Sequence, residues 1–152
     1  VLSLFFLFSI PTLSNSYNPL SILFLLVIIW SSDSAGYFFG IKYGKRKLME
    51  SVSPKKTVVG FVSGILSSIV VSIIFALIIN FENIFELILI GILISFIGSI
   101  GDLIESKFKR QYEVKDSGKI LKSHGGMFDR LDSLIFVAPF VYLLYNFKIL
   151  LL

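Results

Sequence analysis

The chemically richest part of this sequence is a short polar stretch, residues 114–133, which lies between two apolar segments. It reads VKDSGKILKSHGGMFDRLDS and contains three aspartates, four cations, three glycines and the only histidine of the chain. On a helix, Asp129 and Asp132 would place their carboxylates on one face, close enough to share an ion. Carboxylates among Lys and Arg are suited to holding a divalent metal while phosphates are neutralised nearby. The plainer alternative is a solvated, salt-bridged loop.

Two adjacent glycines, Gly125 and Gly126, come shortly before Asp129. Because glycine has no side chain, backbone N–H groups at these positions could approach an anion closely. The sequence contains neither GxGxxG nor GxxxxGK[ST], so the soluble phosphate-binding folds are not supported. The role of His124 stays open between a base, a phosphate donor and a brace of the loop, and a structural hydrogen bond is the commoner use of a lone histidine.

Two further polar features lie upstream. Asp33 falls in or at the edge of an apolar stretch, where a carboxylate is costly and is therefore a candidate functional group. The alternative is an interfacial Asp at a helix end. SPKKT, residues 53–57, combines Ser-Pro, which is typical of a turn, with Lys55 and Lys56 at the expected start of a helix. There the two ammonium groups could bind lipid or nucleotide phosphates.

The composition indicates that membrane helices position these groups. Hydrophobic residues make up 55% and charged residues 16% of the 152 residues, and the mean hydropathy is +0.88. These values are typical of a membrane protein. The absence of cysteine excludes disulfides, cysteine-ligated zinc and thiol nucleophiles. Because backbone groups in lipid must satisfy one another, we expect an all-α, polytopic transmembrane helical bundle.

We expect about four to five helices in a single transmembrane catalytic domain, residues 1–152. Apolar sequence begins at Val1 without the basic region of a signal peptide, so we expect further helices upstream in the full-length protein. In the third segment, small residues recur every four positions and predict close helix packing. The expected segments are 1–13, 19–41, 58–79, 84–101 and 133–147, and the small residues are Gly60, Gly64, Ser68 and Ser72.

The cations gather in two loops. Of the 14 Lys and Arg residues, six lie between Lys42 and Thr57 and seven between Asp102 and Asp132, whereas the connection NFENIFE has none. Two helices separate the basic loops, so both emerge on one side, which the positive-inside rule makes cytoplasmic. We therefore expect two cytoplasmic loops, whose carboxylates and cations are the candidate catalytic groups. The net charge of +4 by itself implies no anionic ligand.

Residues 106–133, SKFKRQYEVKDSGKILKSHGGMFDRLDS, resemble the C-terminal signature of the phosphatidate cytidylyltransferase family, also called CDP-diacylglycerol synthases. That signature has the form S-x-x-K-R-x4-K-D-x-G, followed by H-G-G-x-x-D-R-x-D. DSAGYFFG, SPKKT and GDLIES also resemble family segments, in the same order. One departure is Lys122-Ser123, where the family has Pro-Gly, and we expect it to loosen or reshape the turn before His124. The matched positions are Ser106, Lys109, Arg110, Lys115, Asp116, Gly118, His124, Gly125, Gly126, Asp129, Arg130 and Asp132.

The resemblance implies that a cytidylyl group is transferred from CTP to phosphatidate with Mg²⁺, giving CDP-diacylglycerol and pyrophosphate in phospholipid biosynthesis. Direct displacement is sufficient, so no protein nucleophile is required. The expected metal ligands are Asp102, Asp129 and Asp132. The expected catalytic residues are Asp116, His124, Asp129, Arg130 and Asp132, with Asp33 at the rim of the site. The expected substrate-binding residues are Lys55, Lys56, Ser106, Lys109, Arg110, Lys115, Gly125 and Gly126.

The expected partners are CTP, phosphatidate and the lipid bilayer, without nucleic acid, and a homodimer is also considered. The expected location is the bacterial inner membrane. A related CTP-using enzyme of isoprenoid lipids, such as a polyprenol kinase or a CDP-archaeol synthase, would use similar loops. A transporter or structural membrane subunit would explain the spans and Asp33, but not HGGMFDRLD. The density of signature matches favours the phosphatidate cytidylyltransferase family.

Overall fold

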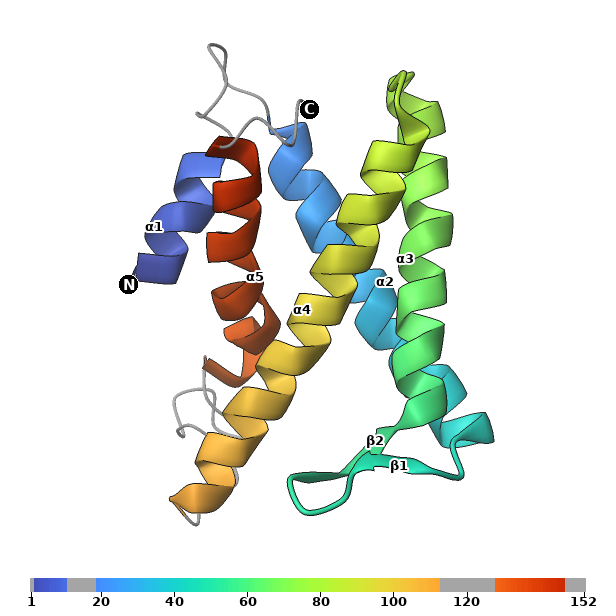
Figure 1. Cartoon of the computed structure of the whole chain (residues 1–152), viewed down its shortest axis with the longest axis vertical. Coiled ribbons are helices and arrows are strands. Elements are labelled where there is room, and N and C mark those ends of the chain that lie inside the picture. Colours follow the sequence, from blue (N-terminus) through green and yellow to red (C-terminus); the bar gives the residue numbers. More distant parts are fainter. Residues whose placement is uncertain (1, 11–18, 113–127, 147–152) are drawn as a thin grey trace.

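A computed structural model describes residues 2–10, 19–112 and 128–146, which form a helical bundle with one β-hairpin (Figure 1). Three of the helices, α2, α3 and α4, are long and apolar enough to cross a membrane. This confirms the expected helical membrane protein. The helices are α1 (Leu2–Ser9), α2 (Leu20–Tyr43), α3 (Val58–Ile79), α4 (Ile84–Gln111) and α5 (Phe128–Asn146), and the strands are β1 (Lys47–Met49) and β2 (Ser53–Thr57).

Helix α3 packs closely against α2 on one side and α4 on the other. A Cβ atom added at Gly60 of α3 would lie 2.7 Å from the carbonyl oxygen of Gly36 in α2. One added at Gly91 of α4 would collide with the hydroxyl of Ser72 in α3. Small residues thus let the backbones approach, as is common in membrane helices. The predicted stripe is confirmed, since its four members, Gly60, Gly64, Ser68 and Ser72, are all buried.

Helices α4 and α5 form the second half of the bundle, with α1 beside α5 (Figure 1). A Cβ added at Gly98 of α4 would lie 3.5 Å from Cγ2 of Val137 in α5. The rings of Phe6 in α1 and Tyr142 in α5 have centroids 4.7 Å apart. Buried apolar side chains from α2, α4 and α5 then share one core. They include Phe24, Leu25, Ile28, Leu87, Ile90, Ile94, Val137 and Val141.

Helix α4 is longer than the sequence analysis predicts. Instead of ending near Gly101, it has 28 residues and continues to Gln111. The extension is stabilised by an ion pair between Lys109 and Glu105, one turn apart at 3.2 Å, and by basic residues in the last turn, which interact favourably with the helix dipole. The first part of the predicted second loop is therefore helical.

The SPKKT segment also differs from its prediction, because it forms strand β2 and does not begin a helix. It pairs antiparallel with β1, with Lys47 opposite Thr57 and Met49 opposite Ser53. A two-stranded sheet has only edge strands, so Pro54, which has no backbone N–H, is tolerated there. Helix α3 begins directly after Thr57. The predicted all-α bundle thus carries one small sheet.

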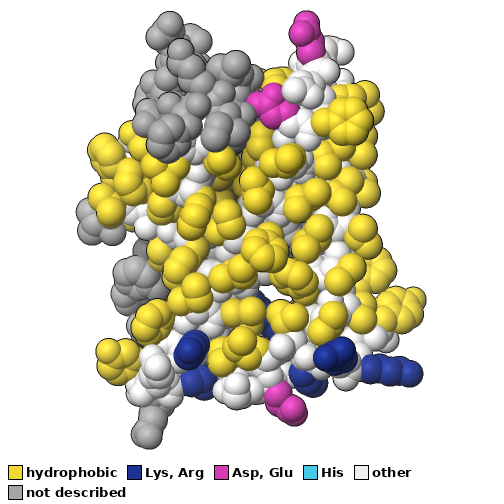
Figure 2. All heavy atoms as spheres, in the orientation of Figure 1, with side chains coloured by type: hydrophobic (Ala, Val, Ile, Leu, Met, Phe, Trp, Pro, Cys, Tyr) yellow, Lys and Arg dark blue, Asp and Glu magenta, His cyan; other side chains and the backbone are white. Residues whose placement is uncertain are grey.

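The hairpin and the described first part of the second basic segment lie at the same end of the bundle, as predicted. The hairpin and the C-terminal end of α4 are both at the lower end in Figure 1. Figure 2 shows Lys and Arg side chains gathered at this end, with hydrophobic side chains covering the middle of the visible face. The structure therefore places these cationic side chains at one end of the apolar helical bundle.

The contact of α2 with α3 predicts a sharp difference between two glycine substitutions. Gly60→Ala should lower the free energy of unfolding by about 1–3 kcal/mol, because the new methyl group meets backbone that cannot move alone. Gly98→Ala, whose methyl group would find its nearest neighbour at an ordinary 3.5 Å, should be within about 1 kcal/mol of the wild type. Thermal unfolding in one detergent measures both. Equal melting temperatures would contradict the packing described.

Candidate functional site

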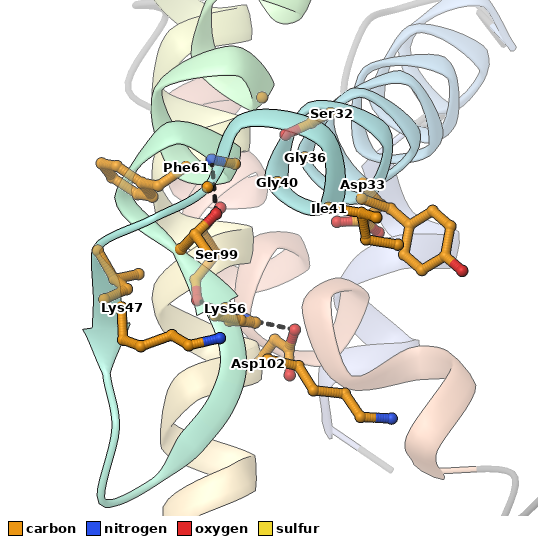
Figure 3. Close-up of a pocket in the computed structure, with 17 residues that line it drawn as sticks. Ser32, Asp33, Gly36, Gly40, Ile41, Lys47, Lys56, Phe61, Ser99 and Asp102 are labelled. Carbon is orange, nitrogen blue, oxygen red and sulfur yellow. Dashed lines mark hydrogen bonds and ion pairs between the residues drawn. The ribbon is translucent and has the colours of Figure 1, made fainter.

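A cavity of about 600 Å³ lies at the cationic end of the bundle, where the hairpin meets α2, α3 and α4 (Figure 3). Small residues of the α2–α3 crossing form part of its wall, so the cavity depends on the close approach of these helices. Its charged lining residues are Asp33, Lys47, Lys55, Lys56 and Asp102, and its larger apolar ones are Tyr37, Ile41, Leu48 and Phe61. The cavity thus offers both signs of charge beside an apolar surface.

An ion pair between Lys56 of β2 and Asp102 of α4 stands at the wall of this cavity (Figure 3). The Lys56 ammonium also donates to the carbonyl oxygen of Ser99 at 3.4 Å. The second carboxylate oxygen of Asp102 accepts from the hydroxyl of Ser106, also at 3.4 Å. The Lys56 and Asp102 side chains are 26% and 31% exposed, so water and solutes reach both. The pair joins the two basic segments of the sequence.

The hairpin is attached to α4 at a second point. Nε of Arg110 donates to the carbonyl oxygen of Val52, in the turn between the strands, at 3.5 Å, and the Val52 side chain is buried. Ser106, Lys109 and Arg110, all predicted to bind substrate, therefore lie on the helical extension of α4. Two contacts, the Lys56–Asp102 ion pair and the Arg110–Val52 hydrogen bond, thus hold α4 beside the hairpin.

Thr57 connects the hairpin to α3 and is buried between them. Its hydroxyl oxygen accepts a hydrogen bond from the backbone N–H of Gly60 at 3.1 Å and so caps the helix. Gly44, just after α2, packs directly on Thr57, because a Cβ added there would collide with the threonine side chain. The sequence analysis does not identify Thr57 as a site residue, although a Thr three residues before Gly60 and ahead of an apolar run is a recognisable cap signal.

A buried pair of hydroxyls joins α2 and α4 next to the cavity. Oγ of Ser32 in α2 and Oγ of Ser95 in α4 are 2.6 Å apart. Ser32 and Ser99 both line the cavity, and Ser99 lies one helical turn beyond Ser95. These serines carry no charge and match no motif, so the sequence alone gives them no weight. Their spacing of one turn on α4 is the signal that could have indicated a shared face.

Of the predicted acidic residues, Asp33 and Asp102 line the same cavity. Asp33 is exposed and lies in α2, in keeping with its predicted place at the rim. Asp129, Arg130 and Asp132 lie in the first turns of α5, so the two aspartates are three positions apart on a helix as predicted, but their side chains lie outside the described ones. Lys115, Asp116, His124, Gly125 and Gly126 lie outside the described residues.

The packing of α5 on α4 indicates where those first turns lie. A Cβ added at Gly98 would be 3.6 Å from Cβ of Ser133, and one added at Gly101 would meet Phe136. Gly101 directly precedes Asp102, and α5 begins only a few residues before Ser133. The start of α5 is therefore at the same end of the bundle as Asp102, as Figure 1 also shows.

Asp102 is suited to a divalent cation. Its carboxylate is partly exposed at the cavity, one oxygen already faces the Lys56 ammonium, and a hydroxyl lies beside the other. Positive charge is thus favoured at this position, and carboxylate and hydroxyl oxygens are hard ligands of the kind that Mg²⁺ prefers. Among the residues whose side chains are described, no three acidic or histidine groups form a cluster. Asp102 is therefore the one predicted metal ligand whose side chain the structure describes.

Apolar spanning helices with a charged cavity at their cationic end define a membrane protein that presents lysines and carboxylates near one membrane surface. Within that class, the model of the cytidylyltransferase family matches residues 1–148, and the chain belongs to this family. The resemblance found in the sequence is thereby confirmed.

Curated relatives support the same assignment. The chain is 47% identical over 131 residues to the phosphatidate cytidylyltransferase of Bacillus subtilis (strain 168), which covers 86% of this chain and 49% of the relative. It is 44% identical over 124 residues to that of Staphylococcus haemolyticus (strain JCSC1435), covering 81% and 48%. For that of Staphylococcus aureus (strain COL), the identity is 40% over 124 residues, with the same coverage of 81% and 48%. The chain spans about half the length of these relatives.

The cap at Thr57 generates a prediction about stability. Thr57→Val keeps the shape of the side chain but removes the acceptor for the Gly60 N–H, and should cost about 1 kcal/mol of unfolding free energy. Thr57→Ser keeps the acceptor and serves as the matched control. Thermal unfolding of both variants in the same detergent checks this. A serine variant less stable than the valine variant would show that packing, and not the hydrogen bond, is the main contribution.

Proposed function

We propose that this chain is the catalytic part of a phosphatidate cytidylyltransferase, which transfers the cytidylyl group of CTP to phosphatidate and releases pyrophosphate. The observation that carries the proposal is the Lys56–Asp102 pair at the cavity wall, in a chain of the cytidylyltransferase family. The pair brings together an ammonium group, which can bind phosphate, and a carboxylate, which can bind a metal ion, at one end of the apolar helices.

The reaction requires two anionic molecules to meet. A phosphate oxygen of phosphatidate attacks the α-phosphorus of CTP, the bond from that phosphorus to the bridging oxygen breaks, and pyrophosphate leaves with the bond electrons. Cations around the phosphates reduce their mutual repulsion and stabilise the charge that develops on the leaving group. We assign this role to Lys55 and Lys56 of the hairpin, to Lys109 and Arg110 of α4, and to Lys115 and Arg130. The neutral residues Ser106, Gly125 and Gly126 are assigned to substrate binding as hydrogen-bond donors to phosphate oxygens.

Asp102, Asp129 and Asp132 are proposed to hold Mg²⁺. When bound, the ion supplies charge stabilisation on phosphate oxygens. The suitability of Asp102 is supported by its partly exposed carboxylate and the cation already beside it. Asp116 and His124 are assigned to the same site on the resemblance alone. Asp33 is placed at the rim, which its position on the cavity lining supports.

The lipid substrate is proposed to approach along the apolar side of the cavity. Ile41, Leu48 and Phe61 are among the lining residues and offer apolar surface for the glycerol and upper acyl carbons of phosphatidate, while the lysines receive its phosphate. The location proposed is the inner membrane of a bacterium, with the hairpin and the α4 extension facing the cytoplasm, because this end carries the cations.

Pyrophosphate release in detergent with CTP, Mg²⁺ and phosphatidate tests the function on the full-length protein. The expected result is release that requires phosphatidate, and CDP-diacylglycerol as the lipid product. Polyprenol and an isoprenoid ether-linked phosphatidate serve as alternative acceptors. Turnover with either of these and none with phosphatidate would replace the proposed substrate, and no CTP consumption with any lipid would remove the enzymatic function.

The orientation can be measured with single cysteines, because the chain contains none. Cysteines at Ser51 of the hairpin turn and Lys107 of the α4 extension should be labelled from the cytoplasmic side, and one at Asn83 from the opposite side. All three positions are exposed. Labelling of Ser51 and Lys107 from opposite faces would contradict a site shared by the two segments.

The role of Asp102 predicts a large loss of activity. Asp102→Asn keeps the size of the side chain but removes the charge that a Mg²⁺ ligand needs. Since each ~1.4 kcal/mol of lost transition-state stabilisation lowers the rate tenfold, and metal stabilisation is worth several, turnover should fall about a hundredfold or more. Glu50→Gln, at the exposed hairpin turn, is the control and should keep its activity. An Asp102→Asn enzyme with normal turnover and an unchanged Mg²⁺ requirement would refute the assignment.

A further inference from the structure

We propose that Lys56 is a built-in counter-ion of Asp102 that leaves this carboxylate when a divalent cation binds and moves to the phosphates of the nucleotide. Metal binding and nucleotide binding are then coupled through one lysine. The proposal rests on the proposed function for the identity of the nucleotide, but the exchange of Lys56 for a metal at Asp102 can be measured without it.

The contacts of Asp102 carry the first step. One of its oxygens faces the Lys56 ammonium and the other accepts from Ser106, so both oxygens have a partner. A metal ion that binds the first oxygen must take the position of the ammonium, because two cations repel each other at such short range. In the structure described, the lysine therefore stands where a metal would be expected, and the two compete for a single carboxylate.

Lys56 has the freedom to leave. Apart from Asp102, its ammonium has a contact of 3.4 Å with the carbonyl of Ser99, which is a long hydrogen bond. Its side chain is 26% exposed and borders the cavity, so it can turn on its flexible stem without crossing packed protein. The strand itself is fixed, since Thr57 is buried and capped to α3, and Arg110 holds the hairpin turn at Val52. Only the side chain has to move.

Lys55 offers an internal comparison. It precedes Lys56 in strand β2, lines the same cavity and is exposed. Neighbouring side chains on a strand point to opposite faces, and the described ion pair with Asp102 is made by Lys56. Both lysines contribute the same charge to the cavity, but removal of Lys55 leaves the carboxylate of Asp102 covered.

The coupling has a predictable size. A metal binds Asp102 only in the fraction of molecules in which Lys56 has left, so an ion pair formed 90% of the time weakens apparent metal affinity roughly tenfold. A nucleotide whose phosphates attract Lys56 removes this competition, and linkage requires that the metal favours nucleotide binding by the same factor. Lys56 thus favours the joint arrival of metal and nucleotide over either one alone.

The test uses Mn²⁺ as the probe ion and measures its binding to the full-length protein in detergent by electron paramagnetic resonance, without nucleotide or lipid. Lys56→Met should bind Mn²⁺ roughly tenfold more tightly than the wild type. Lys55→Met, which removes the same charge, should change the affinity less than threefold. In a second titration, at saturating Mn²⁺, both variants should bind CTP more weakly. If Lys56→Met raises the affinity for Mn²⁺ and lowers the affinity for CTP, the lysine exchanges between the two sites. A lysine that only binds phosphate would change the CTP affinity alone.

Thermal unfolding accompanies each titration, and Lys56→Gln, which keeps a hydrogen-bonding group, repeats the measurement. The proposal is overturned if Lys56→Met and Lys56→Gln bind Mn²⁺ no more tightly than the wild type, or if Lys55→Met tightens binding equally, since the effect would then be one of general charge. The Mn²⁺ titration contains no substrate, so a failure of cytidylyl transfer leaves its result intact. Conversely, an active enzyme with unchanged Mn²⁺ affinity in the Lys56 variants would refute this inference alone.

Discussion

The backbone contact between α2 and α3 is the constraint on which the rest of the structure depends. At Gly36 and Gly60 the two helices approach so closely that no side chain fits between them. This contact fixes where α3 begins, and therefore where Thr57 and the hairpin before it lie. The hairpin in turn places Lys56 beside α4, where it forms an ion pair with Asp102. Helix packing by small residues, which in lipid takes the place of a hydrophobic driving force, thus determines the position of a charged group.

Much of this architecture can be predicted from the sequence. The bounds of α3 follow from an uncharged apolar run, and the burial of its small-residue stripe follows from the four-residue spacing. The placement of the hairpin and the α4 extension at one end of the bundle follows from the number of helices that the sequence predicts between the two basic segments. These predictions succeed because hydrophobic length and periodicity act over many residues, and no single tertiary contact can override them.

The sequence is less informative where local preference and tertiary contact disagree. It places the end of α4 near Gly101, where hydrophobicity stops, but helix propensity and the Glu105–Lys109 pair continue the helix to Gln111. It treats SPKKT as a turn and helix start, because nothing local indicates the partner strand, Lys47–Met49. Its site residues are drawn from charged and motif positions, so it includes Asp102 and Lys56. It leaves out the neutral Ser32 and Ser95, which are brought together from positions 63 residues apart.

The unbroken length of α4 makes the protein sensitive to the membrane around it. With 28 residues, the helix is about 42 Å long, so it spans the hydrocarbon layer and continues beyond it as one rod. A long, continuous helix of this kind changes its tilt when the bilayer becomes thicker or thinner. Because Asp102 and Arg110 sit on its projecting part and both contact the hairpin, a change of tilt pulls on those two contacts directly. The thickness of the lipid layer and the position of the hairpin are thereby linked through one helix.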